Sequence, residues 1–327
     1  MSMSFAVSAL AGRAIAAPQP PGGLYSLTQR QDVLIRFKSD GSNVTVGKVD
    51  LTQFNPIATE LSTIVEKAAT MYVLALNKTG VDTSIIGISL ADASITGIYP
   101  TPLLQGPSEV GLGMTIDAYG RNGLLISGID RTSHKHTAYT VDPANGHAVH
   151  KLSDGFLAGA LNMLDAPHCV DVKSGALWLT TPSKNYSVTG LFDLVSIDLA
   201  KGTERARHTL PSAQMVHAIK HDPLAGGLVA LGLDAAFKPF VFTIDTSTFK
   251  PTIVAGFDAY SVFNGIAAWD PLRRMIYGMA QVSETVRDPV LVGYSLHDQT
   301  KLIADICLYG SACAAPFNLD FFPGALE

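Results

Sequence analysis

The sequence predicts an all-β fold, a six-bladed β-propeller built from four-stranded antiparallel blades. The main observation is a repeat of about fifty residues that joins an acidic residue, a short turn and a run of aliphatic residues. Six acidic anchors carry this repeat, at spacings of 51, 54, 51, 48 and 50 residues: Glu66, Asp117, Asp171, Asp222, Asp270 and Asp320. The second observation is an alternating strand that ends in a turn, as in 139–146 and 195–202.

The composition favours one large domain. The chain has 327 residues, of which 47% are hydrophobic and 16% charged, and a closed propeller uses such apolar material in a single core. We interpret residues 1–22 as a flexible leader or signal remnant and residues 23–327 as one propeller domain. A net charge of −5 excludes a broad basic surface for nucleic acid, and no apolar run reaches the roughly 20 residues that span a bilayer. Neither nucleic acid nor a membrane is therefore an expected partner, and the oligomeric state stays open.

The N-terminus has two interpretations. An apolar stretch at 5–11 precedes Ala14-Ile15-Ala16, which has the form of a signal-peptidase site, so a secreted protein is one expectation. No Lys or Arg precedes that stretch, so a cytoplasmic protein with an Ala-rich leader is the other. Cys307 and Cys313 are spaced for a small disulfide but equally for two reduced thiols, which leaves Cys169 single.

The first blade lacks one strand of its own. Strands are predicted at 24–28, 33–38 and 44–51, with turns between them. The fourth strand is expected from the other end of the chain, at 317–322, where an apolar segment has no blade after it. Pairing the two termini in one blade closes the ring and removes an open sheet edge.

Each remaining blade is predicted to begin with an inner strand that ends at its anchor. Second strands follow at 71–76, 124–128, 176–180, 228–231 and 275–279, and an outer hairpin completes each blade. The longest loops join second to third strands, at 130–137, 182–191 and 281–289, and we expect the site on that face. The anchors end their strands at the opposite face, where Asp-Pro pairs are typical of turns. We therefore interpret the acidic repeat as structural.

Six residues before each anchor lie the predicted starts of the inner strands: Glu60, Gly111, Asp165, Val216, Asn264 and Ala314. The oxygen-bearing members come from alternate blades: Glu60, Asp165 and Asn264. Carboxylates and an amide carbonyl suit calcium or magnesium, so a metal site is one interpretation. The other interpretation is that each side chain caps a local backbone group, and we prefer it.

Two histidines near the same strand starts are the candidate catalytic residues, His168 and His217. A neutral imidazole serves as general acid or base, although a buried histidine is also a common hydrogen-bonded wall residue. Aromatic, apolar and hydrogen-bonding residues nearby predict a pocket for a hydrophobic small molecule. The candidate substrate-binding residues are Asn264, Asn318, Tyr260, Phe263, Met215 and Glu109. No nucleophilic-serine motif or phosphate-binding loop is present in the sequence.

The segment Phe263-Asn264-Gly265-Ile266-Ala267-Ala268-Trp269-Asp270-Pro271 resembles the inner-strand motif of six-bladed propellers of the NHL, gluconolactonase and strictosidine-synthase type. The resemblance to the lactonases implies Asn264 as a metal ligand. In those lactonases a Gly-Glu-Gly-Pro motif near the N-terminus supplies an acid, whereas this chain reads Pro20-Pro21-Gly22-Gly23. In this chain Glu60, which belongs to another blade, would have to supply the acid.

In overall character the chain also resembles fungal propellers that act as hetero-Diels–Alderases in tropolonic sesquiterpenoid biosynthesis. This resemblance implies a cofactor-free cyclase or pericyclase of secondary metabolism, with His168 or His217 as acid or base and Asn264 and Asn318 as hydrogen-bond donors. A divalent-metal lactonase is the alternative. A non-catalytic binding propeller is the third hypothesis; a lectin is disfavoured because tryptophan occurs only at Trp178 and Trp269.

Overall fold

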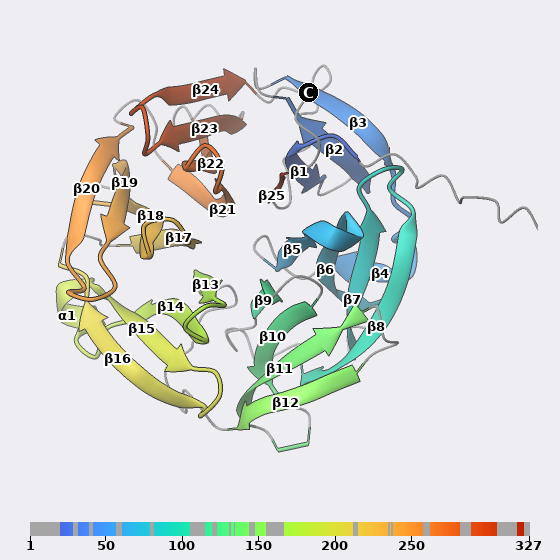
Figure 1. Ribbon diagram of the computed structural model, residues 1–327, viewed down its shortest axis with the longest axis horizontal. Helices are drawn as coiled ribbons and strands as arrows, with labels where there is room; N and C mark the ends of the chain where they lie inside the picture. Colours follow the sequence, from blue (N-terminus) through green and yellow to red (C-terminus); the bar gives the residue numbers. More distant parts are fainter. Residues whose placement is uncertain are drawn as a thin grey trace, which may run out of the picture.

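The computed structural model describes most of the chain, and its strands form six antiparallel sheets around a central axis (Figure 1). This confirms the predicted six-bladed propeller. The described residues are 20–28, 32–38, 42–56, 61–78, 82–104, 115–119, 123–130, 132–133, 135–143, 148–154, 167–211, 215–234, 236, 238–257, 262–281, 289–305 and 319–323.

The first three blades follow one another in chain order. Blade 1 consists, from the axis outward, of β25 (Asp320–Phe322), β1 (Gly23–Leu27), β2 (Val33–Phe37) and β3 (Asn43–Lys48). Blade 2 consists of β4 (Phe54–Pro56), β5 (Ser62–Val65), β6 (Thr70–Asn77), β7 (Asp82–Ser89) and β8 (Ile95–Leu104), with the short 3-10 helix η1 (Glu66–Ala68). Blade 3 consists of β9 (Thr115–Tyr119), β10 (Gly123–Ile129), β11 (His136–Asp142) and β12 (Ala148–Asp154).

The last three blades have the same order. Blade 4 consists of β13 (His168–Asp171), β14 (Ala176–Pro182), β15 (Phe192–Asp198) and β16 (Thr203–Thr209), with one helical turn, α1 (Tyr186–Thr189), between its second and third strands. Blade 5 consists of β17 (Met215–Asp222), β18 (Gly227–Leu233), β19 (Pro239–Ile244) and β20 (Pro251–Gly256). Blade 6 consists of β21 (Val262–Asp270), β22 (Met275–Gln281), β23 (Pro289–Ser295) and β24 (Lys301–Asp305).

The apolar core is divided among the junctions between blades, because each sheet packs both of its faces against neighbours. Blades 4 and 5, for example, meet through Trp178, Leu194 and Phe242, and blades 6 and 1 meet through Phe37 and Leu291. Middle strands such as β18 are consequently buried along almost their whole length, whereas the outermost strand β16 is mostly exposed and charged. The repeat of aliphatic runs in the sequence corresponds to these buried middle strands.

The two ends of the chain share blade 1, as predicted. Strand β25 pairs antiparallel with β1, so Tyr25 lies opposite Asp320 and Gly23 opposite Phe322. The rings of Tyr25 and Phe322 meet edge to face at 6.3 Å between centroids. The last inner strand therefore closes the ring and is itself part of the axial wall.

Blade 2 differs from the prediction because its inner edge is made of two strands. Both β4 and β5 pair with β6, with Phe54 opposite Asn77 and Ser62 opposite Val73. Pro56 at the end of β4 lies opposite Ala75, and Ser62 at the start of β5 lies opposite Val73, so the two strands pair with successive parts of β6. Of the two, β5 lies nearer the axis (Figure 1). The sequence of aliphatic residues gives no sign of this division.

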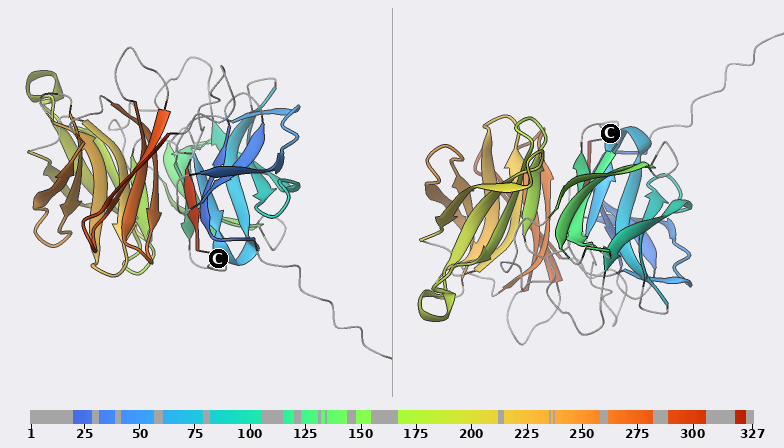
Figure 2. Two further views of the ribbon diagram at one scale, coloured as in Figure 1. Left: turned by 90° about the horizontal axis from the view of Figure 1, so that it is seen from above. Right: turned by 90° about the horizontal axis from the view of Figure 1, so that it is seen from below.

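The acidic anchors of blades 4, 5 and 6 are turn residues, as predicted. The Oδ1 atom of Asp222 accepts bonds from the backbone N–H groups of Leu224 and Ala225, and Asp171 and Asp270 make the same pattern two and three residues ahead. Such turns are typical of aspartate. They place the ends of these inner strands on one face of the ring, which we call the exit end; the opposite face is the entrance end (Figure 2).

No helix among the described residues is long and apolar enough to cross a membrane. Of the proposed leader, 1–22, residues 1–19 lie outside the described part of the chain, as do Cys307 and Cys313, and residues 20–22 lead into β1.

Candidate functional site

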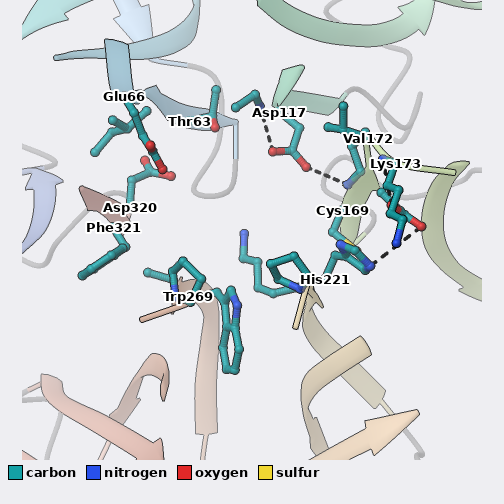
Figure 3. Close-up of a pocket in the computed structure, with 18 residues that line it drawn as sticks. Thr63, Glu66, Asp117, Cys169, Val172, Lys173, His221, Trp269, Asp320 and Phe321 are labelled. Carbon is teal, nitrogen blue, oxygen red and sulfur yellow. Dashed lines mark hydrogen bonds and ion pairs between the residues drawn. The ribbon is translucent and has the colours of Figure 1, made fainter. Parts of the chain in front are cut away.

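A cavity of about 570 Å³ lies on the axis at the exit end. All six inner strands line it, so it is a property of the closed ring rather than of one blade. Figure 3 shows side chains from different strands around it, among them Asp117, Asp320 and His221, with the imidazole of His221 turned toward the carboxylate of Asp171. A pocket of this size holds a small organic molecule. The sequence predicted the site at the entrance end instead, and much of that end lies outside the described residues.

One residue from each inner strand forms a layer around this cavity, which we call the axial ring. Each member lies two residues before the last residue of its strand and lines the cavity: Thr63, Asp117, Cys169, Lys220, Ala268 and Asp320. Equivalent positions in a repeated fold lie at one height around the axis. In order of blades from 1 to 6 the ring reads Asp320, Thr63, Asp117, Cys169, Lys220 and Ala268, so charged side chains come from blades 1, 3 and 5.

Four of the six acidic anchors line the cavity, and two of these, Asp117 and Asp320, belong to the axial ring. The prediction that every anchor is a turn residue at the end of its strand does not hold for these two. Asp117 lies two residues before the last residue of β9, and Asp320 is the first of the three residues of β25. The anchors of blades 4 to 6 are instead the last residues of their strands. Because side chains alternate along a strand, a shift of two residues keeps the same face and moves the carboxylate from the turn into the cavity.

Both ring carboxylates bond to the neighbouring blade. Asp117 Oδ2 accepts a 2.9 Å bond from the backbone N–H of Val170 in blade 4, and Asp117 Oδ1 accepts one from its own neighbour, Ala118. Asp320 Oδ2 accepts a 2.5 Å bond from the Ser62 hydroxyl in blade 2. These bonds hold the carboxylates in place while they face the cavity.

Asp320 has the properties of a proton-transfer group. The pKa of Asp320 is raised to about 6, mainly because burial disfavours the charged carboxylate. The Ser62 bond and Lys220 oppose this shift, and the nearby charge of Asp117 adds to it. A carboxyl with such a pKa exchanges protons near neutral pH, which is the requirement for a general acid or base. Lys220 brings an ammonium group to the same layer, suited to a developing oxyanion.

Cys169 is also a member of the axial ring, but its buried thiol is unreactive. Burial raises the pKa of the Cys169 thiol well above its usual value, Asp117 and Asp171 add to the effect, and Lys220 opposes it. The residue is 3% exposed. A buried thiol of this kind is protonated at neutral pH and is not a nucleophile.

We expect Cys169 in the folded protein to resist alkylation by iodoacetamide at about pH 8, because the reaction needs an exposed thiolate. Mass spectrometry of the peptide that contains Cys169, with and without denaturant, measures this. Denatured protein is the control and should be modified fully. Rapid modification of the native protein would contradict the description of this thiol.

The mouth of the cavity combines a polar pair with an apolar wall. His221 Nε2 lies 3.8 Å from Asp171 Oδ2, linking blades 5 and 4. Asp171 is also held by its turn, and its bonds to Ser174 and the facing His221 lower its pKa despite partial burial. The remaining wall is largely apolar, contributed by Ile64, Val172, Trp269 and Phe321. The site thus has charged groups at its floor, and at its mouth the Asp171–His221 pair lies beside apolar surface.

The two histidines predicted as catalytic lie outside the cavity lining. His168 is 6% exposed on the opposite side of β13 from Cys169, and its Nε2 lies 3.1 Å from the backbone oxygen of Ile116 in β9. This position suits a wall residue that links blades 4 and 3. His217 is the extra residue of a bulge in β17, and burial lowers its pKa to about 4. It lies three residues, or roughly 10 Å, from Lys220 toward the entrance end.

His217 nevertheless differs from an ordinary wall residue. Its Nε2 is buried and has no hydrogen-bond partner among the described residues. Bulges often direct a side chain next to a site. A catalytic role for His217 at the entrance end therefore stays a prediction.

The structure corrects one of the six strand-start positions: Val216 is 2% exposed and packs in the core between blades 4 and 5. Phe263 and Asn264 lie in β21, and Met215 lies in β17. The structure describes the backbone of these three residues but not their side chains. Several predicted site residues and strand starts are outside the described residues altogether: Glu60, Glu109, Gly111, Asp165, Tyr260, Ala314 and Asn318. Within the described part of the chain, no three His, Cys, Asp or Glu side chains gather as metal ligands.

Sequence reasoning missed the axial ring because only one of its six residues, Lys220, is unusual for an inner strand. The ring members are spaced by 54, 52, 51, 48 and 52 residues, so the period was sufficient to find them. What the sequence lacked was the position of each strand end to within two residues. The signal was the lysine two residues before the Asp222 anchor, an unusual residue for a buried inner strand.

No family model matches the chain, and no curated protein matches its sequence. Solved structures share its fold. A TolB from Acinetobacter baumannii superposes with a TM-score of 0.59 at 11% identity, over 92% of this chain and 67% of that one. A DUF4784 family protein from Bacteroides caccae has a TM-score of 0.52 at 10% identity, over 92% and 74%. A predicted 6-phosphogluconolactonase from Bacteroides uniformis has a TM-score of 0.50 at 13% identity, over 93% and 87%. These likenesses establish the propeller and leave the function to the site.

Proposed function

We propose that the protein is a cofactor-independent enzyme that transfers protons to and from a hydrophobic small molecule in the axial cavity, with Asp320 as the acid or base. The observation that carries this proposal is a carboxyl group of raised pKa on the floor of a cavity with an apolar wall. Titratable groups with perturbed pKa values in a cleft are typical of active sites.

A dehydrating cyclase is the reaction class that fits this site best. Protonated Asp320 gives its proton to a leaving hydroxyl, the carbon–oxygen bond breaks, and water departs. A carboxylate takes the proton from the substrate's phenolic hydroxyl, which yields a neutral quinone methide. The apolar wall of Trp269, Phe321 and Ile64 then holds an alkene against it, so that proximity drives the cycloaddition. Lys220 stabilises negative charge on the phenolic oxygen.

Lactone hydrolysis is the second candidate, supported by the fold likeness to the predicted 6-phosphogluconolactonase. Asp320 would act as the base that activates water. The cavity holds four acids, Glu66, Asp117, Asp171 and Asp320, against two lysines and His221. This balance disfavours a substrate that carries a phosphate, so a neutral lactone is the form that fits.

Two neutral probes test the proposed function without knowledge of the natural substrate. Ring opening of nitrobenzisoxazole needs one base in an apolar pocket: the base takes the ring C–H proton, the nitrogen–oxygen bond breaks, and a coloured phenolate forms. We expect the protein to accelerate this reaction, with a rate that rises as Asp320 ionises through about pH 6 and is constant above about pH 7.

Hydrolysis of dihydrocoumarin is the comparison. Dihydrocoumarin turnover that a chelator abolishes would favour the metal-dependent lactonase. Turnover of neither probe above the rate of a heat-denatured sample would favour a non-catalytic binding propeller and contradict the proposal.

A further inference from the structure

Three large apolar side chains are exposed close together at the exit end. Val172 is 46% exposed, Leu224 72% and Leu272 62%. Each lies in the turn that follows an inner strand, in the neighbouring blades 4, 5 and 6. The other large apolar side chains exposed to this degree among the described residues are scattered over β8, α1 and β20: Ile98, Val188 and Ile253. A group of exposed apolar side chains is typical of a surface that binds a partner.

These three side chains border the axial cavity. Val172 lines the cavity itself, and so do Pro223 and Pro271, which precede Leu224 and Leu272 in their turns. We call these five residues the apolar rim. A segment of chain that packs on the apolar rim therefore also covers the mouth of the cavity.

The N-terminal segment joins the ring at the same end. Gly23 begins β1 and lies opposite Phe322, the last residue of β25, so the residues just before Gly23 are at the exit end. The Tyr25 hydroxyl donates a 2.7 Å bond to the backbone oxygen of Pro21, which fixes this part of the chain. Residues 1–19 therefore precede a point on blade 1, the neighbour of blade 6 in the ring.

The composition of residues 1–19 suits the surface beside which they join the ring. Residues 5–11 are largely apolar, like the apolar rim. Arg13 is the only charged side chain of the segment, and Glu66 is an exposed acid of the cavity lining. Residues 12–19 connect the apolar stretch to the ring, and eight residues of extended chain reach about 28 Å. The segment is thus long enough to cross the exit end, and its apolar and charged groups match those it meets there.

We propose that residues 5–11 bind to the apolar rim and cover the axial cavity of the same molecule. Phe5, Val7 and Leu10 supply the apolar side chains that pack against the rim. Because the bound segment lies over the mouth, it controls the access of small molecules to the cavity. The inference goes beyond the proposed function: it requires the cavity and the apolar rim, but no particular reaction inside them.

Photo-crosslinking of the full chain tests where the segment lies. The variant Phe5→benzoylphenylalanine, irradiated in dilute solution and analysed by mass spectrometry, should form bonds to the peptides that contain Val172, Leu224 or Leu272. Crosslinks within one molecule are expected, because a tethered segment has a high effective concentration at its own ring. Crosslinks to another surface, crosslinks only between two molecules, or no crosslink at all would overturn the inference.

Substitutions on the ring test whether the apolar rim is the binding surface. Leu224→Asp should lower the crosslinking yield from position 5 about tenfold, because an ionised side chain opposes apolar packing. The matched control is Val188→Asp, which makes a comparable change in α1 at a side chain that is 88% exposed, and it should leave the yield unchanged. Both positions are exposed, so neither substitution should disturb the fold. Equal yields from the two variants would contradict the assignment to the apolar rim.

Binding of the neutral apolar dye N-phenylnaphthylamine, measured by its fluorescence, tests whether the segment covers the cavity. We expect Leu10→Asp to bind the dye at least about fivefold more tightly than the wild-type chain, because the open form is then more populated. Ser2→Asp adds the same charge outside the apolar stretch and should leave the affinity unchanged. Equal affinity of the wild-type and Leu10→Asp chains would show that the cavity is not covered. These experiments measure binding alone, so their failure is distinct from failure of the proton-transfer assay.

Discussion

Replacing Asp320 by asparagine is expected to reduce the rate of nitrobenzisoxazole ring opening by about 100-fold, to near the background of the solution reaction. Asparagine keeps the shape of the side chain and can still accept the Ser62 bond, but it cannot take a proton. The variant should therefore fold normally. Initial rates measured across about pH 5 to 8 should also lose their rise through about pH 6, which in the wild-type protein follows ionisation of Asp320.

The control variants show whether the reaction takes place in the axial cavity at the exit end or at the entrance end of the ring. Asp298→Asn changes an exposed turn aspartate far from the cavity and should leave the rate unchanged. His168→Gln and His217→Gln test the residues that the sequence favoured. If either histidine variant loses the activity while Asp320→Asn retains it, the reaction takes place at the entrance end and the assignment to Asp320 is wrong.

Replacing Asp222 by alanine is expected to lower the free energy of unfolding by about 3 kcal/mol. Asp222 is 2% exposed and supports both its own turn and the next blade. Its Oδ2 accepts two bonds from the Arg274 guanidinium, at 3.0 Å from Nε and 2.7 Å from Nη2. The substitution removes this link between blades 5 and 6 and leaves a half-buried cation without its acid.

Urea unfolding monitored by tryptophan fluorescence measures this effect. The matched control is Asp245→Ala, because Asp245 makes the same backbone bonds two and three residues ahead but is exposed and has no arginine. Its loss of stability should be much smaller. In a double-mutant cycle with Arg274→Met, the two substitutions should be strongly non-additive. Equal effects of Asp222→Ala and Asp245→Ala would show that the link between blades contributes nothing.

The blades were predictable because their signal is local and repeated. Each buried middle strand, such as β18 and β22, needs an aliphatic run, and each turn at the exit end needs a residue such as Asp222. Ring closure was also predictable, since the apolar segment at 317–322 had no blade after it and the first blade lacked a strand. Six repetitions of one pattern outweigh errors at any single strand.

The site was less predictable because it depends on register. Asp117 and Asp222 look alike in the sequence, yet one faces the cavity and the other ends its strand at a turn. A difference of two residues in strand length decides between these positions, and strand ends are the least reliable part of any sequence-based prediction. The split inner edge of blade 2, made of β4 and β5, depends likewise on tertiary pairing with β6.

The most direct test of the account is the titration of the Asp320 side chain by carbon-detected NMR, with Asp320→Asn used to assign its signal. The Asp320 carboxyl lines the axial cavity, and burial raises its pKa to about 6. We expect the Asp320 carboxyl carbon to titrate with a midpoint near that value. A midpoint near 4, as for an ordinary exposed aspartate, would contradict the central claim that this cavity is built for proton transfer.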